Sequence, residues 1–112
     1  MQNWSKNVEF NDKSYLQPTS LVELQELIRT NPKVRARGTA HCFNEIANTS
    51  SVAVNLAKMP RVIDVSSELS SVKVSAGLTY GELAPELHNQ GWALDNLASL
   101  PHISISGSIS TG

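Results

Sequence analysis

Two segments of the 112-residue sequence combine residue types that could hold a ligand. The first, residues 35–44 (RARGTAHCFN), runs from an extended stretch into a glycine turn and then a histidine beside the only cysteine. A turn of this kind can aim successive backbone N–H groups at one point and form a nest for phosphate oxygens. Glycine suits such a turn because the backbone must approach the ligand closely and can need a positive φ.

The second segment is the tail, residues 99–112 (SLPHISISGSISTG), which holds five serines, one threonine and two glycines with isoleucines between them. Small residues with hydroxyls suit a loop along which a polar ligand lies flat against the backbone. A glycine turn after a strand is in most proteins only a turn. Each segment by itself therefore leaves the function open.

Two helices are expected to support these segments. Leucine and isoleucine recur at helical spacing over residues 21–28, after a capping box of Ser20 and Glu23, and Asn31 ends this helix because proline follows it. The second helix is expected between residues 79 and 91, with its own capping box and a glycine stop.

Pro85 lies inside the second expected helix. Proline has no N–H to bond the carbonyl of Gly81, so we expect this helix to kink or to begin later. Short strands are expected at residues 8–10, 33–37, 52–56, 62–65, 72–74 and 92–94, where apolar residues alternate or cluster. Short strands mixed with two helices predict a single α+β domain over residues 1–112.

The composition excludes several classes of protein. Ten acidic and nine basic residues give a net charge of −1, without the basic excess of a nucleic-acid binder. No apolar run approaches the roughly 18–20 residues of a membrane span, and the polar N-terminus lacks the apolar core of a signal peptide. One cysteine allows neither an internal disulfide nor a tetra-cysteine zinc site. We expect no metal site and a reducing, cytoplasmic location.

Four stretches, in order along the chain, carry a likeness to a known family: Asn3-Trp4, residues 38–47 (GTAHCFNEIA), 79–84 (TYGELA) and 98–104 (ASLPHIS). They resemble the N-terminal FAD-binding region of bacterial alditol (xylitol) oxidases, in the vanillyl-alcohol-oxidase superfamily of flavoproteins. The last stretch is the most specific of the four. The resemblance implies that residues 1–112 are the N-terminal part of a PCMH-type FAD-binding domain.

In the family that this sequence resembles, the histidine at the place of His41 is bonded covalently to the isoalloxazine ring. Residues 36–42 match the pyrophosphate loop, in which Arg37 stands where an apolar residue is commoner, Ala40 where glycine is usual and Cys42 where serine is usual. A Cβ at position 40 penalises positive φ. The candidate FAD-binding residues are Ala36, Arg37, Gly38, Thr39, Ala40, His41, Cys42, Ser99, Ser104, Gly107, Ser108, Ile109 and Ser110.

Other interpretations of these residues stay open. His41 could be an ordinary loop or core histidine, and Arg35 could lie on a solvated strand face instead of neutralising pyrophosphate. A thiol or metal pair of Cys42 with His41 is disfavoured, because adjacent residues of an extended chain point to opposite faces. His88 and His102 are expected to be structural or surface residues, and both tryptophans to be packing residues.

The resemblance implies an FAD-dependent oxidase that converts polyols such as xylitol or sorbitol with oxygen into an aldehyde and hydrogen peroxide. The alternative is a non-catalytic, truncated fragment that retains no cofactor, because the sequence stops at Gly112, where the serine- and glycine-rich loop of the family that it resembles continues. No residue matches a catalytic position of the family. We therefore expect the 112-residue chain to be inactive by itself.

Overall fold

The structure, a computed structural model, describes residues 1–111 and contains one parallel sheet and one hairpin. The parallel sheet joins β1 (Ser14–Leu16), β3 (Val52–Val54) and β2 (Val34–Ala36), in that order. Ser14 and Val34 both pair with Val52, so the two outer strands end level with each other. All three residues of the central strand are buried, which agrees with the unbroken apolar run of its sequence.

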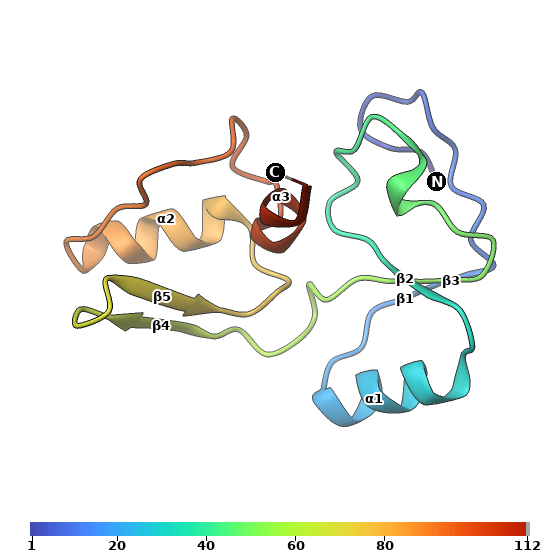
Figure 1. Ribbon diagram of the computed structural model, residues 1–112, viewed down its shortest axis with the longest axis horizontal. Helices are drawn as coiled ribbons and strands as arrows, with labels where there is room; N and C mark the ends of the chain where they lie inside the picture. Colours follow the sequence, from blue (N-terminus) through green and yellow to red (C-terminus); the bar gives the residue numbers. More distant parts are fainter. Residues whose placement is uncertain (112) are drawn as a thin grey trace.

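The second group consists of an antiparallel hairpin, β4 (Ile63–Ser66) and β5 (Ser71–Val74), and the helix α2 (Tyr80–Asn89), which packs against it. Figure 1 shows this group on the left, the parallel sheet on the right and the last helix, α3 (Ile105–Thr111), between them. The larger core cluster is formed by α2, the segment before it and the start of α3. Its buried members are Leu78, Tyr80, Leu83, Leu87 and Ile105.

Helix α1 (Leu21–Thr30) connects the two outer strands of the parallel sheet and confirms the first expected helix. The Ser20 hydroxyl accepts the N–H of Glu23 at 3.1 Å. The Glu23 carboxylate accepts the N–H of Thr19 at 2.7 Å, so the capping interaction reaches one residue further back than a capping box requires.

Helix α2 begins at Tyr80 and continues through Pro85, so the expectation of a later start is wrong. The Glu82 carboxylate accepts the N–H of Thr79 at 2.9 Å and its hydroxyl at 3.0 Å, which secures the first turn. The N–H of Gly81 also donates to Pro101 O at 2.6 Å. These contacts hold the start of the helix in place although the proline removes one hydrogen bond.

Gly91 ends α2 as expected, with φ at 78°. Its N–H donates to His88 O, and the N–H of Trp92 donates to Leu87 O, the pair of bonds of a Schellman motif. Residues 92–94 form no strand, so that expectation is wrong. Trp92 is instead used to close the helix end.

The tail differs most from the expectation, because residues 105–111 form α3 and not a loop. The Ser110 hydroxyl donates to Ser106 O at 2.6 Å and the Thr111 hydroxyl to Gly107 O at 3.1 Å, so hydroxyls turn back onto the helix's own carbonyls. Ile105 is buried and anchors the helix to the core. The α+β fold class is confirmed, with three α-helices and the short 3₁₀ helix η1 (Glu45–Ala47) among the described residues. Within residues 1–111, no helix is long and apolar enough to cross a membrane.

Candidate functional site

Three segments leave the parallel sheet at the carboxyl ends of its strands: Gln17 after β1, the loop 37–42 after β2 and Asn55 after β3. The N–H of Arg37 donates to Val54 O at 2.8 Å, and the N–H of Asn55 donates to Leu16 O at 3.0 Å. In open parallel sheets ligands bind at this edge. The fold therefore places the predicted anion-binding loop where a ligand site is expected.

The loop presents a run of free donors. Within residues 1–111, the backbone N–H groups of residues 38–42 have no hydrogen-bond acceptor. Ala40 has φ of 60°, the left-handed conformation that contributes to a backbone nest, so the predicted penalty on its Cβ is present in the fold. Its methyl group is buried against Val8 and Phe10, and its carbonyl accepts the N–H of Trp4 at 2.8 Å. Packing thus holds a conformation that alanine disfavours.

His41 is held by three other side chains. Its Nδ1 lies 2.9 Å from the Thr39 hydroxyl, and its ring stacks on Trp4 at 5.9 Å between centroids and lies 4.7 Å from the ring of His102. Its Nε2 is buried and has no partner among the described residues. Trp4, predicted to be a packing residue, and His102, predicted to be a structural or surface residue, are therefore part of the site.

The electrostatic surroundings favour the neutral form of His41. Burial of the ring and the nearby His102 lower the pKa of His41, and a hydrogen bond with the backbone of Thr39 opposes this only in part. A neutral imidazole keeps a lone pair on one nitrogen. It can therefore act as a nucleophile near neutral pH.

The loop and the tail meet at Ser104, which is buried. The Ser104 N–H donates to the Thr39 hydroxyl at 3.3 Å. A Cβ on Gly38 would overlap Ser104 Oγ, and one on Gly107 would lie 2.7 Å from the same atom. The two segments singled out in the sequence are thus brought together, and a Cβ at either glycine would require the Ser104 hydroxyl to move.

Arg37 contributes to this loop through its backbone only. Its side chain is fully buried, pairs with Asp12 at 2.7 Å and donates to Ala47 O at 3.2 Å. The guanidinium also lies 3.8 Å from the ring centroid of Phe10. The charge of Arg37 therefore joins the N-terminal segment to the sheet and does not face the free N–H groups. Arg35 is exposed, as the solvated-face interpretation predicts.

The remaining predicted residues are spread over the tail and the end of β2. Ala36 is exposed at that strand end, Cys42 is half-buried, and Ile109 and Ser110 are exposed on α3. The N–H of Ser108 donates to Ser104 O at 3.0 Å, within the first turn of α3. Ser99 lies apart from these residues, in the wall of a pocket beside the start of α2.

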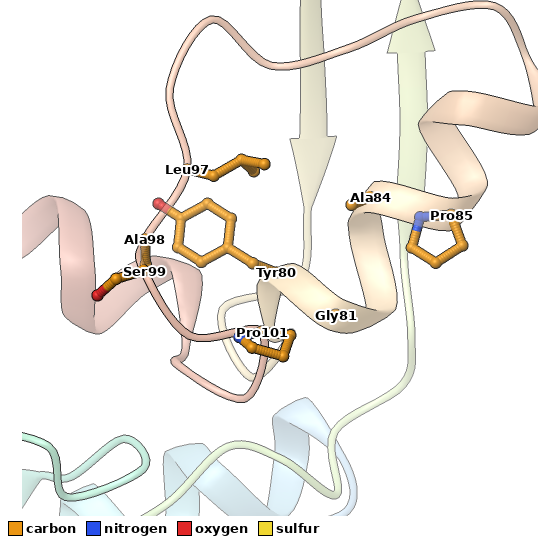
Figure 2. Close-up of a pocket in the computed structure, with 8 residues that line it drawn as sticks. All are labelled: Tyr80, Gly81, Ala84, Pro85, Leu97, Ala98, Ser99 and Pro101. Atoms are coloured by element: carbon orange, nitrogen blue, oxygen red, sulfur yellow. The ribbon is translucent and has the colours of Figure 1, made fainter.

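This pocket has a volume of about 420 Å³ and is lined in part by the first turn of α2. Figure 2 shows the ring of Tyr80 between Leu97 and Pro101, with Ser99 on the segment that passes beside it. The lining residues are Tyr80, Gly81, Ala84, Pro85, Leu97, Ala98, Ser99 and Pro101. No residue of the loop 37–42 lines this pocket, so the structure does not bring Ser99 to that loop.

Two buried asparagines were missed by the sequence analysis as site residues. Asn3 donates from Nδ2 to Cys42 O at 2.7 Å and accepts the N–H of Val8 at 3.0 Å, which ties the N-terminus to the histidine loop. Asn55 donates to the carbonyls of Arg37 and Gly38. The position of Asn55, directly after an apolar strand, is the signal that could have found it.

The arrangement fits an FAD molecule on two observations. Consecutive free N–H groups suit a pyrophosphate, and the buried Nε2 of His41 lacks a partner that a bound group could supply. These features suit a domain that binds a dinucleotide cofactor. The chain belongs to the FAD binding domain family, whose sequence profile matches residues 13–112.

The chain is similar to several flavoenzymes. It is 38% identical to an alditol oxidase of Streptomyces sp. over 98% of this chain and 27% of that protein. It is 35% identical to L-gulonolactone oxidase of Mus musculus over 99% of this chain and 26% of that protein. The chain thus spans about a quarter of the length of these curated relatives.

Solved structures agree on the fold. The chain superposes on cholesterol oxidase from Brevibacterium sterolicum, in a His121Ala mutant, with a TM-score of 0.79 and 18% identity. The match covers 96% of this chain and 22% of that one. At this identity the likeness shows the fold alone, and it confirms the predicted PCMH-type FAD-binding architecture.

Proposed function

We propose that the loop 37–42 binds the pyrophosphate of FAD through its backbone N–H groups. The observation that carries the proposal is the run of free N–H groups from residue 38 to 42, directly beside the unpartnered Nε2 of His41. Charge-assisted hydrogen bonds from backbone N–H groups to phosphate need no basic side chain. This accounts for the use of Arg37 inside the fold.

We also propose that FAD is attached covalently to His41. The proposal is supported by the lowered pKa of His41, which favours the neutral imidazole, and by the contacts of its ring with the rings of Trp4 and His102. A ring fixed in this way loses little freedom when it forms a bond. The resemblance of residues 38–47 to the alditol oxidases gives the same assignment.

The experiment is to express the chain in the presence of FAD and precipitate it with acid. The flavin colour should stay with the wild-type polypeptide, whereas His41→Ala should release it. His88→Ala is the matched control, because His88 is exposed on α2 and should retain the flavin. Free release of flavin from the wild type would contradict covalent attachment.

For the whole protein we propose oxidation of a polyol such as xylitol or sorbitol, and a cytoplasmic location. When bound, FAD supplies the hydride acceptor and the reduction of oxygen. The alcohol loses two electrons and two protons to become an aldehyde, and oxygen gains them to become hydrogen peroxide. The similarity to alditol oxidase supports the polyol, and the single cysteine supports the reducing compartment.

The second candidate substrate class is a sugar lactone, because the chain is nearly as similar to L-gulonolactone oxidase as to alditol oxidase. Peroxide release by the whole protein is measured with xylitol, sorbitol and L-gulonolactone. A comparison of the three kcat/KM values separates the two substrate classes. A higher kcat/KM for the lactone than for both polyols would refute the polyol assignment.

A further inference from the structure

We propose that Asn55 is a positioning residue that aims the N–H groups of Gly38 and Thr39 at the bound anion. Its side-chain amide donates to two consecutive loop carbonyls, Arg37 O at 3.0 Å and Gly38 O at 3.1 Å. The identity of the anion, a pyrophosphate, rests on the proposed function. The orientation of the loop does not.

The peptide geometry links these carbonyls to the free donors. In a trans peptide the C=O and the N–H lie in one plane and point in opposite directions, and the described chain contains no cis peptide. Arg37 O shares its peptide with the N–H of Gly38, and Gly38 O shares its peptide with the N–H of Thr39. Because Asn55 holds both oxygens, both N–H groups point away from Asn55.

Asn55 is itself held in one orientation. Its Oδ1 accepts the N–H of Ala57 at 2.9 Å and the side-chain amide of Gln17 at 3.2 Å, and the residue is only 8% exposed. Reversing the amide would place its oxygen against two carbonyl oxygens, and its NH₂ group against two donors. These four contacts therefore fix the side chain of Asn55 with its NH₂ group toward the loop.

This arrangement ties the ends of all three parallel strands to the loop. Gln17 follows β1, Gly38 lies in the loop after β2 and Asn55 follows β3. Asparagine is required because it offers two donors on one side and an acceptor on the other. A carboxylate of the same shape would offer only acceptors to the two carbonyls.

The decisive variant is Asn55→Asp, compared with Leu87→Ala, which removes side-chain packing from the core around α2 and away from the loop. FAD affinity is measured in chains that also carry His41→Ala, which prevents covalent attachment, by quenching of flavin fluorescence at a temperature where circular dichroism shows both variants folded. We expect Asn55→Asp to weaken binding about tenfold or more at neutral pH, and Leu87→Ala to change it by less than about threefold.

Two further readouts separate orientation from stability. Lowering the pH protonates the new carboxyl, which can then donate one hydrogen bond, so binding by Asn55→Asp should recover relative to Leu87→Ala. The ¹H–¹⁵N resonances of Gly38 and Thr39 in the FAD-free chain should shift in Asn55→Asp and stay in place in Leu87→Ala. This second readout does not depend on FAD.

Equal losses of affinity in Asn55→Asp and Leu87→Ala would overturn the proposal. If Asn55→Asp does not fold, Asn55→Ser, which cannot reach both carbonyls, is judged by the same criteria. Failure of the wild type to bind FAD would refute the proposed function. The ¹H–¹⁵N resonances of Gly38 and Thr39 would then remain as the test of whether Asn55 orients the loop. Unchanged Gly38 and Thr39 resonances in the variant would then refute its role.

Discussion

The buried pair of Arg37 and Asp12 offers a sharp test of how the base of the loop is held. In Asp12→Ala, the Arg37 guanidinium keeps Ala47 O and the Phe10 ring but loses its countercharge. Removing one partner of a buried ion pair costs about 3–5 kcal/mol. Because the Asp12 side chain is 11% exposed and water can reach the gap, we expect the lower end, about 3 kcal/mol.

A loss of about 3 kcal/mol would lower Tm by roughly 12 °C, since 1 kcal/mol corresponds to about 4 °C in a domain of this size. Urea unfolding followed by circular dichroism measures the free energy directly. The double variant Arg37→Met with Asp12→Ala should recover most of the loss, because an uncharged side chain replaces the unpaired charge. A cost below about 1 kcal/mol for Asp12→Ala, the value of a surface pair, would refute the reasoning.

Four other outcomes are expected. Gly38→Ala should cost about 1–3 kcal/mol through the overlap of its Cβ with Ser104 Oγ and should weaken FAD binding. Adding Ser104→Ala to the same chain should restore part of the free energy of unfolding measured in urea. Cys42→Ser alone should change FAD affinity by less than about twofold. Because the folded-state pKa of His41 is lowered, the contribution of this residue to the free energy of unfolding is complete above about pH 6.5 and is lost as the pH falls through the folded pKa. Unfolding curves of His41→Gln should lack this dependence of stability on pH. Gly91→Ala should cost about 1–2 kcal/mol in thermal unfolding, because φ is 78° and no atom lies near the added Cβ, so the cost is that of the backbone alone.

Local sequence was sufficient for the features that depend on neighbouring residues. Ser20 and Glu23 mark the start of α1 because a cap needs only residues within one turn. Gly91 marks the end of α2 because few other residues adopt its φ. The family-like stretch around His41 predicted the FAD-binding fold that the comparisons confirm.

Features that depend on distant partners were not predictable in this way. The strand alternation places Arg37 with Arg35, yet Arg37 is buried because Asp12, far away in the sequence, supplies its countercharge. The hydroxyl-rich tail has low helix propensity, and α3 forms because Ile105 joins the core and the hydroxyls bond back to the helix. The position of Asn55 after the apolar run 52–54 marks it as a residue at the ligand-binding edge, but its two contacts with the loop depend on carbonyls 17 and 18 residues away.

The central position of β3 has a consequence for synthesis of the chain on the ribosome. Among residues 1–111, β1 and β2 pair only with β3, the last of the three strands to be made, so neither can form this ladder before residues 52–54 emerge. Asn55 emerges immediately afterwards. Until that moment the loop 37–42 has no support for its carbonyls, and the nascent chain carries two unpaired strand segments that helper proteins or neighbouring chains can bind.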